Sequence, residues 1–428
     1  MVYQEIPKSI EKLMNAVTEK SVENPRWAEN FNASFSNTLL TTVKKQADGT
    51  TFLLTGDIPA MWLRDSTAQV RPYLLVAKED EEISDMIAGV VERQLQYVNL
   101  DPYANAFNEE ANNAGHQDDH TEMNPWIWER KYEIDSLCYP VQLSYLLYKE
   151  TGRTDQFNQT FKDAVEKILV LWKIEQNHEN SPYLFERDTW REEDTLVNEG
   201  KGSPIKVTGM TWSGFRPSDD RCIYNYLVPA NMFAVVVLDY LKEIYTNILK
   251  ETELIEDITT LRQEINEGIE QYGQVKNEAG ETIYAYEVDG LGNYSIMDDS
   301  NVPSLLAAPY LGYCSQEDPV YLATRKTLLS KENPYFYEGK YAKGIGSSHT
   351  PENYIWPIAL AIEGLTSLDK SEKKRILDLL VENDGGTNLM HEGFDVDNPN
   401  NYTREWFSWA NMMFCELVLD YYDLRINK

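Results

Sequence analysis

The sequence contains few of the residues that carry metal and redox chemistry. Only four cysteines and five histidines occur among its 428 residues. His116 and His120 are four residues apart, but they lie in a loop-like stretch and not in the HExxH pattern of a zinc-binding helix, so we expect no metal site and no cofactor. The cysteines form no CxxC pair, and their apolar surroundings predict buried free thiols, as in a reducing cytoplasm: Cys138, Cys222, Cys314 and Cys415.

Positive charge is also scarce. Lys and Arg number 39 against 70 Asp and Glu, which gives a net charge of −31. This charge repels nucleic acid and anionic membranes, so we expect neither as a partner and favour a neutral ligand. No apolar run reaches the roughly 18–20 residues that span a bilayer, and the first residues, MVYQEIPKSIEKLMNAV, lack the pattern of a signal peptide. We therefore expect a cytoplasmic protein, whose oligomeric state the sequence does not reveal.

The chain does contain enough hydrophobic residues, 42%, to bury a substantial core. Two segments, LLTTVKKQADGTTFLL and YGQVKNEAGETIYAYEV, alternate around a glycine and predict short β-hairpins. The remaining pattern is helical. Apolar spacing and stop signals predict twelve helices near residues 5–20, 65–79, 82–99, 131–150, 155–177, 225–249, 252–271, 302–312, 318–330, 352–367, 370–382 and 404–424.

The predicted helices alternate in character. Even-numbered helices are apolar over most of their circumference, as in NMFAVVVLDYL, whereas odd-numbered ones are striped, as in SEKKRILDLLVEN. A helix that is apolar all round is buried, and a striped helix covers it. Short links follow the even-numbered helices and long ones follow the odd-numbered helices. The sequence therefore predicts an all-α fold: one (α/α)6-barrel catalytic domain over residues 1–428, with long loops and short β-hairpins on or beside one face. An irregular two-lobed helical bundle is the alternative.

The six long loops of such a barrel open on one face and carry aromatic, acidic, basic and amide side chains. Sugars need this mixture, because their C–H faces stack on Trp rings and their hydroxyls bind charged groups. Hydrolysis of a glycosidic bond needs two carboxyl groups as well. The loop-face residues that we select are Trp62, Arg64, Asp65, Glu129, Asp135, Arg216, Asp219, Asp220, His349, Asn353, His391 and Glu392.

Some of these residues also have a purely structural interpretation. Asp65, Asp135 and Asp219 stand where a carboxylate could cap a helix N-terminus. Glu392 is harder to explain in that way, because its loop has no helix to cap. The segment DDHTE at 118–122 resembles the magnesium-binding motif of helical terpene synthases, but it lies in a loop with few cations to meet a diphosphate.

Three segments together carry a family resemblance: GDIPAMWLRDSTAQVRPYL at 56–74, FRPSDDRCIYNYLVPANMFA at 215–234 and MHEGF at 390–394. With these in order, the chain resembles glycoside hydrolase family 125 from about residue 20 to 424. That family comprises bacterial and fungal exo-acting α-1,6-mannosidases. The resemblance implies an (α/α)6 fold, inversion of the anomeric carbon and no metal, with α-mannosides such as N-glycan fragments as substrates.

The resemblance also implies residue roles. The general acid is an Asp of the PSDD segment, either Asp219, which we favour, or Asp220. The general base is Glu392, and Arg64 and Asp65 look like the clamps on the terminal mannose. Inversion requires an acid and a base roughly 6.5–9.5 Å apart, with room for water between them. Two alternatives stay open: a sugar epimerase that uses histidines as proton shuttles, and a carbohydrate-binding barrel without catalysis.

Overall fold

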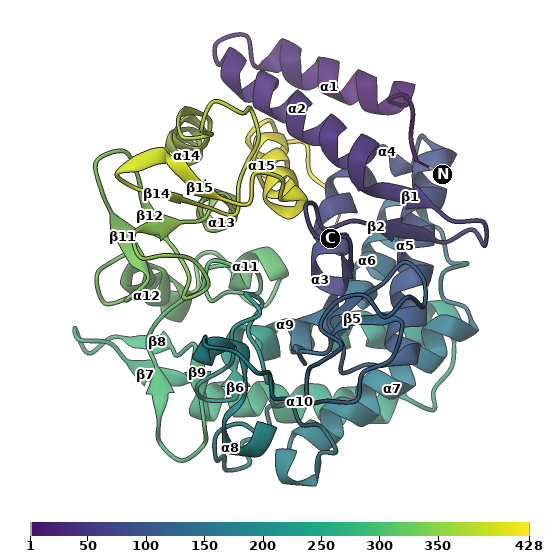
Figure 1. Ribbon diagram of the computed structural model, residues 1–428, viewed down its shortest axis with the longest axis vertical. Helices are drawn as coiled ribbons and strands as arrows, with labels where there is room; N and C mark the ends of the chain where they lie inside the picture. The colour runs from purple at the N-terminus through teal and green to yellow at the C-terminus, as the bar shows by residue number, and fades with distance from the viewer. Residues whose placement is uncertain (1, 428) are drawn as a thin grey trace. The chain divides into compact units, whose positions relative to one another are not determined.

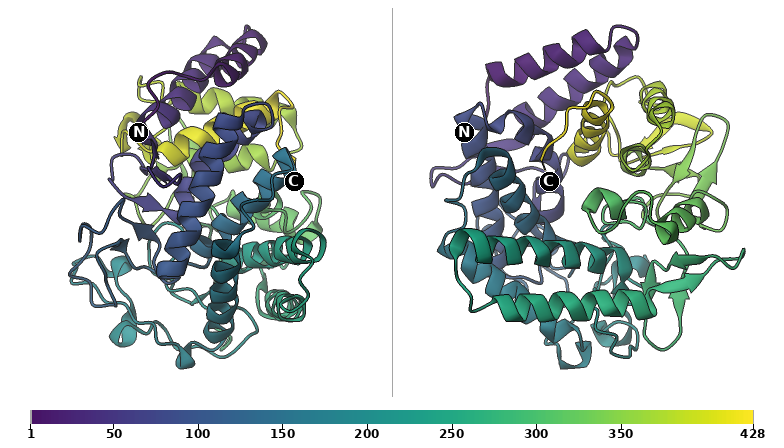
Figure 2. Two further views of the ribbon diagram at one scale, coloured as in Figure 1. Left: turned by 90° about the vertical axis from the view of Figure 1, so that its right-hand side faces the viewer. Right: turned by 180° about the vertical axis from the view of Figure 1, so that it is seen from behind.

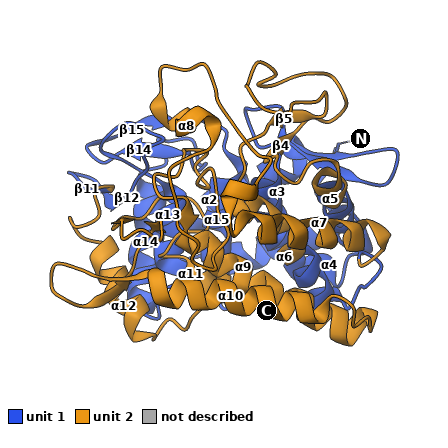
Figure 3. Ribbon diagram, turned by 90° about the horizontal axis from the view of Figure 1, so that it is seen from below, with its two compact units in different colours: residues 1–94, 143–156, 336–428 blue, residues 95–142, 157–335 orange. Residues whose placement is uncertain are grey.

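The computed structural model describes residues 2–427, and most of its regular structure is helical (Figure 1). The chain divides into two compact units (Figure 3). Unit 1 comprises residues 1–94, 143–156 and 336–428, and unit 2 comprises residues 95–142 and 157–335. Each unit is thus assembled from separate stretches of sequence, and the chain passes between them within helices α5 and α6. In the described part of the chain, no helix combines the length and the apolar character that crossing a membrane requires.

In unit 1, the buried helices α3, α13 and α15 are covered by striped ones. Helices α13 and α15 are buried over nearly their whole lengths and pack against each other, as their apolar sequences predict. Helix α14 buries only one stripe, which includes Ile376, Leu377 and Leu380. The helices of this unit are α1 (Lys8–Lys20), α2 (Pro25–Thr42), α3 (Leu63–Val70), α4 (Leu74–Ala77), most of α5 (Glu81–Leu100), the second half of α6 (Ile134–Thr151), α13 (Pro357–Leu365), α14 (Lys370–Glu382) and α15 (Ser408–Tyr421).

Unit 2 repeats this alternation. Helix α9 is buried on almost every side, and α10 packs along it with a buried stripe that includes Leu261 and Ile265 (Figure 2). Asn158 caps the N-terminus of helix α7, because its side chain accepts a hydrogen bond from the backbone N–H of Phe161. The helices are the first half of α6, α7 (Gln159–Glu175), α8 (Val197–Gly200), α9 (Val228–Glu243), α10 (Ile255–Tyr272), α11 (Ala308–Leu311) and α12 (Pro319–Leu328).

The strands are short and form small antiparallel sheets. The two predicted hairpins are confirmed as β1–β2 and β7–β8. Sequence reasoning missed the other strands, which flank the loops that carry the candidate site. In unit 1 the strands are β1 (Val43–Lys45), β2 (Thr51–Leu53), β3 (Met61–Trp62), β11 (Phe336–Glu338), β12 (Lys343–Ile345), β13 (Tyr354–Ile355), β14 (Gly393–Asp395) and β15 (Asn398–Thr403). In unit 2 they are β4 (Ala106–Phe107), β5 (Ile127–Glu129), β6 (Tyr226–Leu227), β7 (Gln274–Lys276), β8 (Thr282–Tyr284), β9 (Glu287–Val288) and β10 (Tyr294–Ser295).

All twelve predicted helices overlap observed ones, but two expectations are wrong. The expected long loop over 21–64 contains helix α2, which lies beside α1 in Figures 1 and 2. The helix expected over 302–312 shrinks to Ala308–Leu311. The backbone N–H groups of Leu305 and Leu306 donate instead to the two carboxylate oxygens of Asp298, each at 2.9 Å, which holds that segment as a loop.

Candidate active site

In unit 2, a tight hairpin over 214–222 carries the two adjacent aspartates. The backbone N–H of Asp219 donates to the Arg216 carbonyl at 2.9 Å, and that of Arg216 donates to the Asp220 carbonyl at 2.8 Å. This is a three-residue loop, whose last position requires a left-handed backbone. Asp219 occupies that position with φ +67°. No helix begins here, since α9 starts at Val228, so helix capping does not explain Asp219.

The two aspartates differ in their contacts. The carboxylate of Asp220 is fully buried and accepts two hydrogen bonds of 2.9 Å from the Arg191 guanidinium. Asp219 is half-buried, and its Oδ1 accepts a 3.3 Å hydrogen bond from the Asn105 amide. Arginine pairing in a fork geometry favours an ionised carboxylate, which has no proton to give. The contacts therefore suit Asp219 better than Asp220 to the role of a proton donor.

Glu129, from strand β5, lies next to Asp219. The Asn105 amide group bridges the two, because it also donates to Glu129 Oε1 at 3.1 Å. Arg187 donates to Glu129 Oε2 at 2.8 Å, and Lys131 Nζ lies 3.8 Å from the same oxygen. Burial would raise the pKa of Glu129, but the charges of Lys131 and Arg187 outweigh burial and lower it. Glu129 is therefore an anion beside Asp219, and a neighbouring negative charge favours the protonated form of a carboxyl group.

Lys131 connects Glu129 to the aspartate hairpin. Its ammonium group donates to the backbone carbonyl of Asp219 at 2.7 Å and to Asp194 at 3.1 Å. Arg216, selected as a substrate-binding residue, is buried and donates to Glu287 Oε1 at 2.6 Å. Its observed contacts suit the anchoring of the hairpin, and its binding role stays a prediction.

Asp135 and Asp298 are buried in the same unit. Asp135 lies in the first turn of α6, and its binding role stays a prediction. Asp298 follows strand β10, and burial raises its pKa to about 8. Its neighbour Asp299 accepts a 2.6 Å hydrogen bond from the Ser218 hydroxyl, which connects this loop to the aspartate hairpin.

In unit 1, the segment MWLRD passes from strand β3 directly into helix α3. Arg64 and Asp65 fall in the first turn of the helix and are almost fully buried, with Arg64 Nε 3.1 Å from Asp65 Oδ1. The Arg64 guanidinium also lies 5.4 Å from the centre of the Trp409 ring, a cation–π distance. The Trp62 indole is 5% exposed, and its N–H has no acceptor among residues 2–427. A buried donor without an acceptor fits a contact to a ligand hydroxyl.

Arg404 connects the start of this motif to Glu392. Its guanidinium donates to Asp57 Oδ1 at 2.6 and 2.9 Å, and its Nη1 lies 3.7 Å from Glu392 Oε1. Burial would lower the pKa of Arg404, but the carboxylates of Glu392 and Asp57 raise it. Glu392 itself is almost buried, and its carboxylate accepts no hydrogen bond from any residue in the described chain. It is therefore available to a water molecule.

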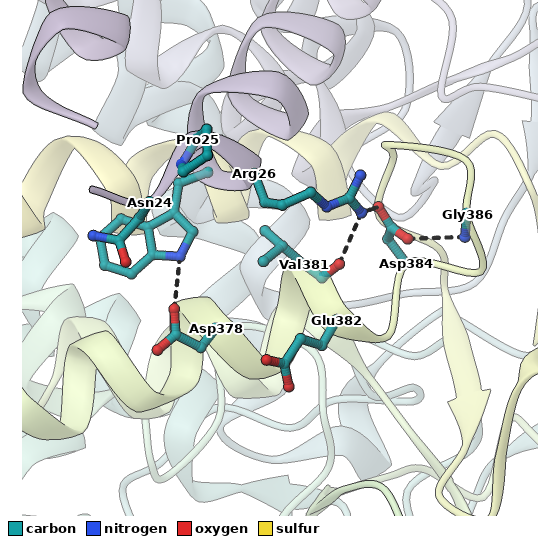
Figure 4. A pocket seen from close by; sticks show the side chains of 9 residues that line it. Asn24, Pro25, Arg26, Asp378, Val381, Glu382, Asp384 and Gly386 are labelled. Carbon is teal, nitrogen blue, oxygen red and sulfur yellow. Dashed lines mark hydrogen bonds and ion pairs between the residues drawn. The ribbon is translucent and has the colours of Figure 1, made fainter. Parts of the chain in front are cut away.

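The loop before Glu392 is held from one side by helix α2 (Figure 4). Arg26 donates to Asp384 Oδ2 at 2.6 Å and to the Val381 carbonyl at 3.0 Å, and Asn30 donates to the same Asp384 oxygen at 2.8 Å. Arg26, Val381 and Asp384 line a cavity of about 460 Å³ between the start of α2 and the end of α14. The loop that leads to the catalytic candidate thus depends on a helix more than 350 residues earlier in the chain.

The imidazole ring of His391 contacts the same loop. Its Nε2 lies 3.2 Å from the Asp384 carbonyl and 3.1 Å from the Thr387 hydroxyl, and its Nδ1 lies 3.1 Å from the Glu405 carbonyl. The ring stacks on Tyr402 with 3.8 Å between the ring centres, and burial lowers the pKa of His391. These contacts suit a neutral residue that positions Glu392, and its substrate-binding role stays a prediction.

The remaining selected residues lie in the loop before β13. His349 is half-buried, 6.3 Å from the Trp356 ring between ring centres. Asn353 is exposed in a left-handed conformation with φ +67°, and its carbonyl accepts a hydrogen bond from Val396. Trp356 also lies beside Gly393, the residue after Glu392. The binding roles of His349 and Asn353 stay predictions.

Each unit thus gathers part of the selected set. Unit 1 holds Trp62, Arg64, Asp65, His349, Asn353, His391 and Glu392, and unit 2 holds Glu129, Asp135, Arg216, Asp219 and Asp220. Sequence reasoning missed the residues that support them, which are Arg26, Asp57, Asn105, Lys131, Arg187, Arg191 and Glu287. Only Asp57 lies within a recognised segment, and the others carry no local signal. Among residues 2–427, no three His, Cys, Asp or Glu side chains form a group that could hold a metal ion.

Residues 24–419 match the family described as metal-independent alpha-mannosidase, glycoside hydrolase family 125. The meiotically up-regulated gene 157 protein of Schizosaccharomyces pombe is 37% identical over 96% of this chain and 85% of its own length. A solved Streptococcus pneumoniae structure is 61% identical, with a TM-score of 0.97, over 99% of this chain and 100% of that one. It is described as a metal-independent alpha-mannosidase in a non-productive substrate complex with α-1,6-mannobiose.

More distant structures share the fold alone. A bacterial glucoamylase complexed with acarbose has a TM-score of 0.63 at 10% identity, over 97% of this chain and 58% of that one.

Proposed function

Because this chain belongs to glycoside hydrolase family 125, the metal-independent alpha-mannosidases, we propose that it removes single α-1,6-linked mannose units from the non-reducing ends of mannosides. The family assignment makes the protein a glycoside hydrolase, and it decides against the epimerase and the inert binding barrel. Exo-action, the 1,6 linkage, inversion and N-glycan fragments as substrates are our proposal. The observation that carries the linkage is the 61% identity to the Streptococcus pneumoniae protein that was solved with α-1,6-mannobiose.

For the architecture, we propose that both units form one catalytic domain built on an (α/α)6 barrel. The support is the alternation of buried and striped helices within each unit, as in α9 with α10 and α13 with α14.

In the proposed reaction, Asp219 donates a proton to the leaving oxygen while Glu392 removes a proton from the attacking water. The Glu129 anion beside Asp219 favours the protonated form of that carboxyl group, and the Lys131 ammonium group acts in the opposite sense. Glu392 Oε1 lies 3.7 Å from the Arg404 guanidinium, which also fixes the orientation of its loop through Asp57. We assign substrate binding to Trp62, Arg64, Asp65, Glu129, Asp135, Arg216, His349, Asn353 and His391.

The test of this function is a panel of α-1,2-, α-1,3- and α-1,6-mannobioses followed by NMR, with and without chelator. We expect the 1,6 isomer to be cleaved preferentially, with β-mannose as the first product and no effect of chelator. First release of α-mannose would contradict inversion, and an epimerised product would contradict hydrolysis.

A substitution tests the proposed base. Glu392→Gln removes the proton acceptor while it keeps the size of the side chain, so kcat should fall by about 10²–10⁴-fold with mannose binding retained. Glu405→Gln, at an exposed position of the neighbouring loop, is the matched control and should keep full activity. Substantial turnover by Glu392→Gln would reject the assignment.

A further inference from the structure

One tryptophan in unit 2 stands out by its exposure. Trp190 is 93% exposed, more than any other large hydrophobic side chain in the described part of the chain. Six other tryptophans are buried, as is usual for a side chain that can bury about 150–250 Å²: Trp27, Trp62, Trp172, Trp212, Trp356 and Trp409. An exposed indole face can serve as a stacking surface for a ligand, and tryptophan is enriched among the residues that carry most of the binding energy at interfaces.

The loop that carries Trp190 is firmly attached to the aspartate hairpin. On one side of Trp190, Arg187 binds Asp119 and Glu129 at 2.7–2.8 Å. On the other side, Arg191 binds Asp220 at 2.9 Å, and its backbone N–H donates to the Thr189 hydroxyl at 3.1 Å.

Two further contacts reach the hairpin from the same loop. Asp194 accepts a hydrogen bond from Lys131, and the Glu193 carbonyl accepts one of 2.7 Å from the backbone N–H of Arg221. Trp190 therefore projects from an ordered loop, which reduces the entropy lost when a ligand stacks on it.

The charges around Trp190 select its ligand. The exposed side chains nearby in the loop are acidic, with Asp188 97% and Glu192 84% exposed. An anionic ligand is repelled from such a surface. An uncharged sugar is not repelled, and its C–H face matches an indole ring.

We propose that Trp190 is a stacking platform for the sugars on the leaving-group side of longer mannosides, beyond the bond that is cut. This inference rests on the proposed function. A general acid acts on the leaving oxygen, so the loop that binds the hairpin of Asp219 lies beside the part of the substrate that departs. Trp190 thereby makes the enzyme favour oligosaccharides over disaccharides.

The experiment compares kcat/KM for linear α-1,6-mannobiose, mannotriose and mannotetraose. For Trp190→Ala, we expect a loss that grows with substrate length and reaches about fivefold to tenfold for the longest, mainly through KM. Trp190→Phe should recover part of this loss, because it keeps an aromatic face. Leu291→Ala, which removes another exposed apolar side chain of unit 2, is the matched control and should show no dependence on length.

A binding measurement provides a second readout. In the Glu392→Gln background, titration with mannotriose should shift the tryptophan emission to shorter wavelength, and Trp190→Phe should remove that shift. Equal losses for all three lengths, or no loss for any, would overturn the inference. If the wild type fails to cleave every mannobiose and mannotriose, the proposed function itself is wrong, which is a distinguishable result.

Discussion

Asp219 occupies a left-handed position at which most hairpins place glycine, asparagine or aspartate. The turn therefore accepts an aspartate at little cost, and the carboxyl group of Asp219 meets the Asn105 amide. Asp220 points instead to Arg191. The sequence motif alone could not separate these neighbours, because the residue that distinguishes them lies 29 positions earlier in the chain.

We expect Asp219→Asn and Asp220→Asn to differ on substrates with different leaving groups. Loss of the general acid should lower kcat for α-1,6-mannobiose by about 10²–10⁴-fold. The loss should be much smaller for dinitrophenyl α-mannoside, whose leaving group departs without a proton. Asp220→Asn should lower both rates by a similar factor, since it disturbs the loop through Arg191. Steady-state kinetics on the two substrates check this, and the reverse pattern would assign the acid to Asp220.

The buried Asp298 predicts a pH dependence of stability. Burial raises its pKa to about 8 in the folded state, against about 3.9 in an unfolded chain. The folded state then binds the extra proton between these values. The stability that this proton contributes is fully present below about pH 4 and is lost as the pH rises through about 8.

Asp298→Asn should therefore reduce the fall in the free energy of unfolding between pH 5 and pH 8.5, as measured by urea denaturation. Asp188→Asn, at an exposed position, is the control and should keep the wild-type slope. An unchanged slope in Asp298→Asn would show that this carboxyl group is ionised throughout the range.

At the scale of elements, helix α2 supports the loop of the proposed base. Arg26→Ala removes the guanidinium that donates to Glu29, Asn388, Val381 and Asp384. Asp384 then keeps only Asn30 and a backbone N–H. We expect a loss of about 1–2 kcal/mol in the free energy of unfolding. Because Glu392 follows the same loop, kcat should fall by about tenfold, with KM nearly unchanged.

The conservative Arg26→Lys keeps one charged contact and should restore part of kcat. Lys374→Ala breaks an exposed ion pair of helix α14, and it should change neither kcat nor stability by much. If Arg26→Ala lowers stability but leaves kcat at the wild-type value, the loop is held adequately without α2.

The absence of α2 from the predicted elements has a physical cause. Its sequence, PRWAENFNASFSNTLLTT, is rich in Asn, Ser and Thr, which have weak helix propensity and compete for backbone hydrogen bonds. In the folded protein these side chains bind partners distant in the sequence instead. Ser34 donates to Asn411, and Thr38 pairs with Ser408 at 2.6 Å. No local pattern could reveal partners more than 350 residues away.

Other helices and strands could be predicted from the sequence, because the patterns that indicate them are local. The apolar circumference of NMFAVVVLDYL predicts the buried helix α9, and alternation around Gly280 predicts the β7–β8 hairpin. The candidate site could be predicted in the same way, because its residues lie in short continuous segments such as HEGF and PSDD. The side chains that hold those segments, such as Asn105 and Arg187, come from unrelated loops, so only the fold identifies them.

At the scale of the whole molecule, the charge of −31 predicts a response to salt. Self-repulsion destabilises a compact state of high net charge. Raising NaCl from about 10 mM to about 150 mM shortens the screening length from roughly 30 Å to roughly 8 Å. We expect Tm to rise by a few degrees in calorimetry, and sorbitol at equal osmolality should give a smaller rise. A lower Tm would mean that the ion pairs weakened by salt matter more than the repulsion.

The state of the cysteines is relevant to the cellular compartment of the protein. Cys138, Cys222 and Cys415 are buried free thiols, as predicted, whereas the free thiol Cys314 is only partly buried and the prediction of its burial is wrong. Burial raises the pKa of the Cys415 thiol, which makes it unreactive. Location in the cytoplasm stays a prediction.

In unit 1, helix α15 near the end of the chain packs against α2 and α3 near its beginning. During translation, α2 is made more than 350 residues before α15, which at about 5–20 residues per second is a delay of tens of seconds. Helix α1 is made before α2 and packs against it, but Ser34 and Thr38 lack their partners Asn411 and Ser408 for that time. The newborn chain is then most vulnerable at its beginning, where a chaperone that shields residues 25–42 would have the greatest effect on yield.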